Sequence, residues 1–183
     1  MNQAKPPGYD ELKRIKQELP GLSPQMRTAL AAACAERTLP VLERYFKDTQ
    51  VFRDALDAAW AFAERGQADK GQVQKLVDDI EKRAEELYED DEIGATLYAL
   101  NAVTYALQSA VTPESTPAAK AISDAGGAAD LDAGQVGESY VQEEAEWQAQ
   151  ALDIAKKAPA PRRDMFAALP ADSRWLRALR ARN

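Results

Sequence analysis

Apolar side chains recur along this chain at the spacing of an α-helix, and this pattern decides the fold class. The clearest case is the segment from Val73 to Tyr88, where they recur every three or four residues while the charged side chains fall on the opposite side. The apolar stripe consists of Val73, Leu76, Val77, Ile80, Ala84, Leu87 and Tyr88. No run of β-branched residues alternates long enough to predict a strand. We therefore expect an all-α fold, a single compact bundle of about seven to eight helices.

Proline and glycine predict where these helices start, bend and stop. Ser23 and Pro24 are typical of a helix start, and the helix that follows runs to about Phe46 with Pro40 in its middle. Because proline has no amide hydrogen and crowds the preceding turn, this second helix should be kinked or broken there. The carbonyl groups freed by the proline need donors, and long charged side chains nearby could satisfy them. Gly126–Gly127 is expected to weaken or break a later helix.

The segment from Ile93 to Pro113 contains no charged residue, so it could in principle span a bilayer. Threonine, asparagine, glutamine and serine interrupt it, however, and no cluster of lysine or arginine flanks it. We predict a central helix that is buried by its neighbours, and no membrane association.

The chain length fits a single all-helical domain over residues 1–183. Residues 1–8 are expected to be flexible and contain no apolar stretch typical of a signal peptide, which favours a cytoplasmic protein. Residues 159–183 are predicted to be a basic C-terminal extension, in which a short helix carrying Trp175 and Leu179 docks on the bundle.

Composition removes most classes of enzyme. The chain has no histidine and a single cysteine, Cys34, so Ser-His-Asp and Cys-His nucleophilic sites and Cys/His zinc sites cannot form. Glycine-rich phosphate-binding loops are also missing from the sequence. A carboxylate-dependent enzyme would need two acidic side chains that converge in a pocket, which sequence alone does not show. We expect no catalytic activity, no cofactor and no metal ion.

The net charge of −7 is distributed unevenly. Six of the eight residues from Glu85 to Glu92 are acidic, and we call them the acidic ridge: Glu85, Glu86, Glu89, Asp90, Asp91 and Glu92. Such a surface could attract a basic protein partner, although acidic runs also occur as solvated helix ends. The basic residues of the C-terminal extension lack an aromatic platform or a nucleic-acid-binding motif, so we expect no binding to nucleic acid.

The segment from Thr28 to Gln67 permits a comparison with known families. It contains Cys-Ala-Glu-Arg at 34–37, then Leu39-Pro40, then a helix that reads Arg-x-Ala-Leu-x-Ala-Ala-Trp-x-Phe-Ala. A weaker echo, Glu-Glu-Ala-Glu-Trp-Gln, lies at 143–148. This order resembles the immunity protein 5 family of bacterial polymorphic toxin systems, which is all-α, and the related domain-of-unknown-function 416 family.

The resemblance implies a non-enzymatic protein that neutralises a cognate toxin domain by direct contact. It also implies that its matched residues hold the fold: Glu36, Arg37, Pro40, Trp60 and Trp147. Toxin recognition would then lie on other surface, for which the acidic ridge is the candidate. The alternative is a helical housekeeping protein of the domain-of-unknown-function 416 type without a toxin partner. The identity of the toxin and the oligomeric state stay open.

Overall fold

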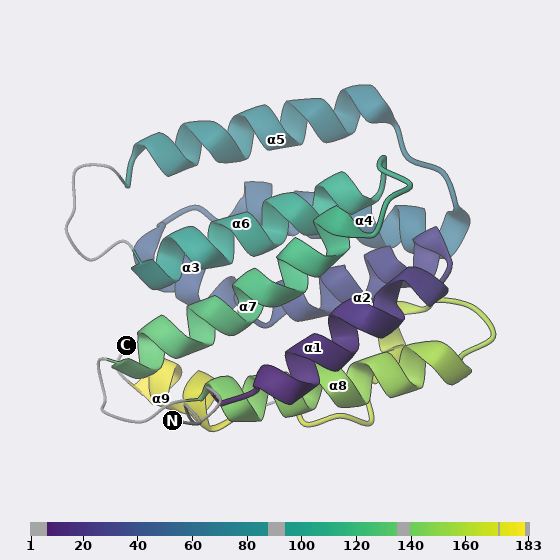
Figure 1. Cartoon of the computed structure of the whole chain (residues 1–183). Coiled ribbons are helices and arrows are strands. Elements are labelled where there is room, and N and C mark those ends of the chain that lie inside the picture. The colour runs from purple at the N-terminus through teal and green to yellow at the C-terminus, as the bar shows by residue number, and fades with distance from the viewer. Residues whose placement is uncertain (1–6, 88–93, 135–139, 172, 182–183) are drawn as a thin grey trace, which may run out of the picture.

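The computed structural model describes residues 7–87, 94–134, 140–171 and 173–181 (Figure 1). Within these ranges the chain forms nine α-helices and two short 3-10 helices and contains no strand, which confirms the all-α prediction. The elements are α1 (Tyr9–Glu18), η1 (Leu19–Gly21), α2 (Pro24–Glu36), α3 (Leu39–Tyr45), α4 (Gln50–Arg65), α5 (Lys70–Glu85), α6 (Gly94–Ser109), α7 (Thr116–Gly134), α8 (Val141–Lys157), η2 (Arg163–Phe166) and α9 (Arg174–Ala181).

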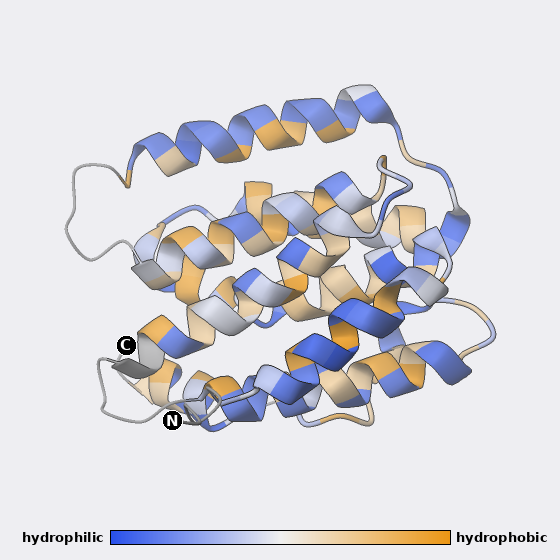
Figure 2. Cartoon of the chain, in the orientation of Figure 1, coloured by the Kyte–Doolittle hydropathy of each residue, from blue (hydrophilic) through white to orange (hydrophobic). Residues whose placement is uncertain are grey.

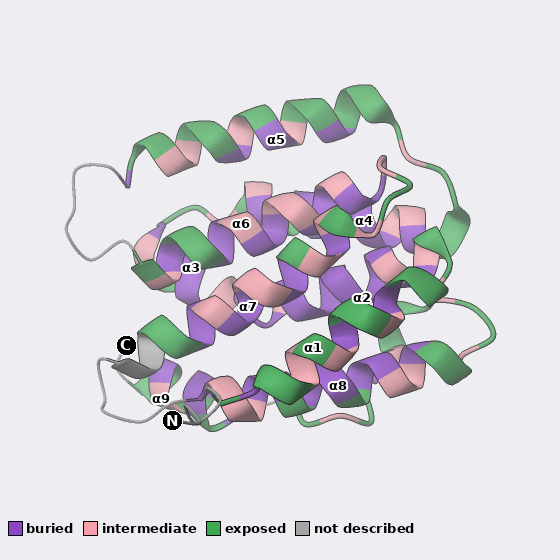
Figure 3. Cartoon of the chain, in the orientation of Figure 1, coloured by how far each residue is buried: buried purple, intermediate pink, exposed green. Residues whose placement is uncertain are grey.

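Helix α2 lies at the centre of the bundle and packs against α4, α6, α7 and α8. Its residues from Thr28 to Ala35 are all buried (Figure 3), because the small side chains of this alanine-rich stretch let neighbouring helices approach from several sides. The predicted central helix corresponds to α6, which packs against α2, α3, α4, α5 and α7. Burial is more complete in α2 than in α6, since Leu97 and Tyr98 at the start of α6 are exposed.

The predicted second helix is broken just before Pro40 rather than kinked, and this break raises the number of α-helices in the described ranges to nine. Helix α2 ends at Glu36, and α3 begins at Leu39 with Pro40 in its first turn. Thr38 supplies hydrogen-bond donors at the C-terminal end of α2. Its amide N–H and its hydroxyl both donate to the carbonyl oxygen of Ala35, at 3.0 and 2.8 Å. Whether long charged side chains satisfy the carbonyls freed by Pro40 stays a prediction.

Helices α4 and α5 follow the sequence signals closely. Gly66 ends α4 in the left-handed conformation, with a φ of 72°, which glycine adopts without a steric penalty. The carboxylate of Asp69 then caps α5 by accepting from the amides of Gly71 and Gln72. Figure 2 shows that α5 lies at the edge of the bundle, with its apolar side turned inward and its polar side outward.

Helix α7 continues through Gly126 and Gly127, where we expected it to weaken or break. Tertiary packing explains the difference, because the aromatic ring of Tyr98 on α6 lies directly against Gly127. A Cβ atom at position 127 would lie 2.7 Å from Cδ1 of Tyr98, closer than packed atoms come. Two glycines lower helix propensity by about 1 kcal/mol each, and contacts with α6 and α8 keep α7 helical despite this cost.

The buried apolar side chains form one cluster that reaches from Ile15 in α1 to Leu179 in α9. Helix α1 packs on α8, α9 contacts α3 and α7, and η2 contacts α8 and α2. Residues 1–6 of the segment expected to be flexible lie outside the described residues, whereas Gly8 is buried and its amide donates to Gln142 at 2.7 Å. No helix in the described part of the chain combines the length and the apolar content needed to cross a bilayer.

Candidate functional site

A buried ion pair between Arg37 and Glu144 joins two distant parts of the chain. Arg37 lies immediately after α2, and Glu144 lies in the first turn of α8. The arginine Nε donates to both carboxylate oxygens, at 3.1 and 2.9 Å, and Nη2 donates to Oε2 at 2.8 Å. The side chains of Arg37 and Glu144 are 6% and 0% exposed. Two charges so far from water are stable only when they satisfy each other and their remaining hydrogen bonds are made.

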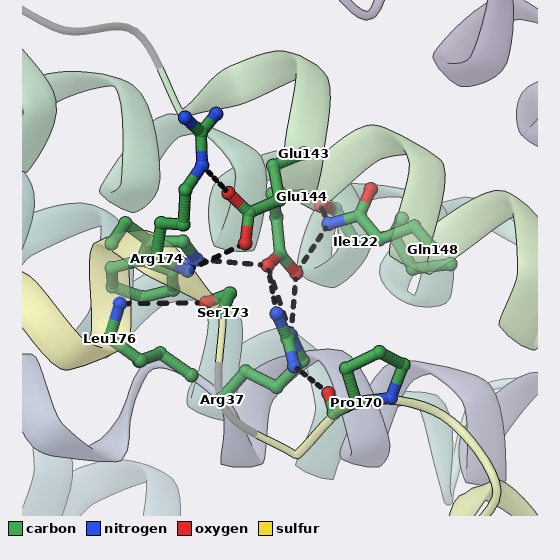
Figure 4. A network of polar contacts seen from close by, with 10 residues as sticks. Arg37, Ile122, Glu143, Glu144, Gln148, Pro170, Ser173, Arg174 and Leu176 are labelled. Atoms are coloured by element: carbon green, nitrogen blue, oxygen red, sulfur yellow. Dashed lines mark hydrogen bonds and ion pairs between the residues drawn. The ribbon is translucent and has the colours of Figure 1, made fainter.

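Further polar groups surround this pair and complete it (Figure 4). The indole N–H of Trp175 in α9 donates to Glu144 Oε2 at 3.2 Å, and the amide of Gln148 donates to the carbonyl oxygen of Ile122 in α7 at 3.0 Å. Arg37 Nη1 also donates to the carbonyl oxygen of Pro170 at 3.3 Å. The network therefore connects α2, α7, α8, α9 and the segment before α9.

Aromatic rings continue the network toward α4. The guanidinium carbon of Arg37 lies 4.2 Å from the ring centroid of Trp147, at the distance of a cation–π contact. Phe166 of η2 lies between Trp147 and Trp60, with ring centroids 6.3 and 6.4 Å away. Pro40 lines a small hollow of about 300 Å³ together with Arg37, Trp147 and Phe166. The structure thus gathers the residues of the sequence motif in one region, where α2, α3, α4 and α8 meet the C-terminal segment.

Glu36 forms an ion pair at the edge of the same region. Arg163 of η2 donates to Glu36 Oε1 through Nε at 2.9 Å and to Asp57 through Nη1 at 2.6 Å. Partial burial raises the pKa of Glu36, and the positive charge of Arg163 opposes this increase. Glu36 therefore ties η2 to α2, while Asp57 ties it to α4.

The structure places only part of the acidic ridge. Glu85 ends α5, Glu86 follows it, and both side chains are exposed. Arg83 donates to Glu86 at 3.0 Å and to Asp48 at 3.4 Å. Glu89, Asp90, Asp91 and Glu92 lie outside the described residues. The ridge stays a prediction in its entirety.

Several basic side chains near the C-terminus meet acidic side chains of the protein itself. Besides Arg163, Lys156 pairs with Glu18 of α1 at 2.6 Å, and Arg174 pairs with Glu143 of α8 at 2.9 Å. These contacts use part of the basic charge of this segment within the bundle.

Glu144 and Gln148 are the network residues to which sequence reasoning assigned no role, and Trp175 was expected to dock on the bundle without a named partner. A usable signal was present in α8, because Glu144 and Gln148 are one helical turn apart, on the side that also carries the buried Leu152. A carboxylate at a core position of a helix predicts a buried cationic partner. Arg37, two residues before α3 begins at Leu39, could have been that partner, but nothing in the sequence pairs positions 37 and 144.

No group of three or more cysteine, aspartate and glutamate side chains among the described residues is placed to hold a metal ion. Cys34 is fully buried in α2, and burial raises the pKa of its thiol well above the usual value, so it is not a nucleophile at neutral pH. The geometry of the Arg37–Glu144 network fits a role in joining helices.

Asp124 on α7 should make the stability of the protein depend on pH. Partial burial raises its pKa to about 6, and Lys120 opposes the shift. Because this folded-state pKa lies above the value near 4 of an unfolded aspartate, the folded state binds more protons between these pH values. Asp124 should therefore destabilise the protein as pH rises from 4 to 6. Replacement by asparagine should raise the free energy of unfolding at pH 7 by roughly 1 kcal/mol, after allowance for the partly exposed side chain, and by less at pH 4. Urea denaturation at both pH values measures this difference; an equal effect at pH 4 and 7 would contradict it.

The described residues form an all-α bundle in which a buried arginine–glutamate pair joins distant helices. Residues 11–144, nearly three quarters of the chain, match the family described as Immunity protein Imm5. The chain therefore belongs to the Imm5 family of immunity proteins. No curated protein and no solved structure matches the chain.

Proposed function

We propose that this protein binds a cognate bacterial toxin domain in the cytoplasm and neutralises it by direct protein–protein contact. The family match over residues 11–144 is the observation that supports this proposal most strongly. In this proposal the motif residues have structural roles, because they hold the helices together and leave other surface for the toxin. These residues are Glu36, Arg37, Pro40, Trp60 and Trp147.

Expression of candidate toxin domains in a sensitive host tests the proposal. Coexpression of this chain should restore growth with its cognate domain and with no unrelated toxin, and the purified pair should form a complex of fixed stoichiometry. Failure to restore growth with any toxin domain encoded beside the gene in its native host would contradict the proposal and favour the housekeeping alternative.

The acidic ridge is part of the proposal, as the surface that attracts the toxin. Glu85→Lys with Glu86→Lys should slow association with the toxin domain roughly tenfold at low ionic strength, and the effect should shrink in high salt. Both side chains are exposed, so the fold should be affected little. Stopped-flow association rates at two salt concentrations measure this effect. Charge reversal of Glu114 and Glu146, also exposed, is the matched control; an equal loss in the control variant would contradict a specific role for the ridge.

A further inference from the structure

Four large apolar side chains are exposed in the described part of the chain, at the starts of α1 and α6 and near the end of α7. Tyr9 is 44%, Leu97 36%, Tyr98 39% and Leu131 42% exposed. Tyr98 lies against α7 at Gly127, and Leu131 of α7 lies against α6 at Gly94. Tyr9 at the start of α1 borders the same surface hollow as Tyr98. Figure 1 shows the starts of α1 and α6 and the end of α7 on one side of the molecule. Apolar patches of this kind on a soluble protein mark interaction sites.

The hollow between α1, α6, α7 and α8 has a volume of about 560 Å³. We call it the tyrosine hollow. Apolar groups from all four helices line it: Tyr9, Leu12, Tyr98, Gly126, Gly127 and Val141. Tyrosine is enriched at the energetic centres of protein interfaces, because a rigid ring offers a large contact area while its hydroxyl stays hydrogen-bonded.

The double glycine in α7 shapes this hollow. With no side chain at position 127, the ring of Tyr98 lies against the backbone of α7, and Cδ1, Cε1 and Cγ would all lie within 3.1 Å of a Cβ added there. By intrinsic propensity, alanine at this position would stabilise the helix by about 1 kcal/mol relative to glycine. Gly127 therefore lets the Tyr98 ring lie against α7, while the side chain stays 39% exposed.

The charge at the rim points to the chemistry of the occupant. Lys13 and Lys16 of α1 line the hollow and are exposed, and neither pairs with a carboxylate in the ranges that the structure describes. Asp130 is the acidic side chain of the lining. An apolar group that carries a negative charge beside it fits this arrangement. A second copy of the chain fits less well, because the net charge of −7 opposes self-association.

We propose that the tyrosine hollow is a docking site on this protein for its toxin partner, which inserts an apolar side chain flanked by a carboxylate. This inference rests on the proposed function and assigns it a contact surface. The ridge and the hollow then have separate roles. The exposed charges of the ridge at the end of α5 raise the rate of association with the toxin. The buried aromatic contact in the tyrosine hollow lowers the rate of dissociation.

Dissociation rates from the toxin domain test this assignment. Tyr98→Ala should raise the dissociation rate roughly 30-fold, as expected for an aromatic residue at the centre of an interface. Tyr105→Ala, a loss of the same ring from the same helix outside the hollow, should change it less than threefold. Gly127→Ala should also speed dissociation, because the new methyl group displaces the Tyr98 ring without removing any contacting group.

Lys16→Glu should weaken binding to the toxin domain roughly tenfold. Lys157→Glu is the control, because Lys157 likewise lies in the last turn of its helix, so both reversals lose the same interaction with the helix dipole.

A small probe separates failure of this inference from failure of the proposed function. Anilinonaphthalene sulfonate combines apolar rings with an anionic group and should bind the folded protein in the hollow, lose affinity in Tyr98→Ala and Lys16→Glu, and be displaced by the toxin domain. If growth is restored but the hollow variants dissociate like their controls, the inference is overturned while the proposed function stands. If the probe binds as expected but no toxin is neutralised, the proposed function fails and the toxin assignment fails with it. A dimer in sedimentation that Tyr98→Ala dissociates would also overturn it, since a second copy would then occupy the hollow.

Discussion

Replacement of Glu144 by alanine is expected to lower the free energy of unfolding by about 3 to 5 kcal/mol. The carboxylate accepts from Arg37 and Trp175, and none of it is exposed to water. Its removal leaves the guanidinium group of Arg37 buried without a counter-charge and the indole N–H of Trp175 without its acceptor. Urea denaturation, followed by circular dichroism and tryptophan fluorescence, measures the loss.

Two comparisons show whether the cost comes from the buried charge. Glu146→Ala, two residues along the same helix and exposed, should cost less than about 1 kcal/mol. Arg37→Met combined with Glu144→Leu should be more stable than the Glu144→Ala variant, because it removes both charges and keeps apolar volume. If Glu144→Ala and Glu146→Ala cost the same, the ion pair does not hold the helices together.

Local signals in the sequence predicted the helices well. The stripe of α5 gave a helix with its apolar residues inside, and Ser23 caps α2 by accepting from the amide of Met26. Each depends on residues within one or two helical turns, so physics at that range suffices to predict it.

Features that depend on contacts between residues far apart in the chain could not be predicted from local sequence patterns. The continuity of α7 through Gly126 and Gly127 comes from the contact with Tyr98, and the function of Arg37 comes from Glu144, which is 107 residues away. The tyrosine hollow also needs side chains from four helices. Local propensity does not contain such pairings, so it predicted a weak or broken helix at Gly126–Gly127 and no partner for Arg37, where tertiary packing determines the result. The resemblance, by contrast, named the family correctly from residues 28–67.

Replacement of Trp175 by alanine should cost about 3 to 5 kcal/mol, because the side chain is fully buried and its loss leaves a cavity. Trp175→Phe should cost less, since the ring keeps much of the apolar contact and only the hydrogen bond to Glu144 and part of the volume are lost. Arg174→Ala, next to it and exposed, should cost less than about 1 kcal/mol.

The same measurements test whether residues 1–183 fold as one domain. We propose that they do, because Trp175 is bonded to Glu144 of α8 and α9 contacts α3 and α7. Loss of helix circular dichroism and loss of tryptophan fluorescence should then coincide in the native protein, and Trp175→Ala should shift both transitions together. A separate early fluorescence transition, with the circular dichroism unchanged, would show that the C-terminal segment unfolds by itself. In that case the stability of the bundle could not depend on the contact between Trp175 and Glu144, and Glu144→Ala would act through Arg37 alone.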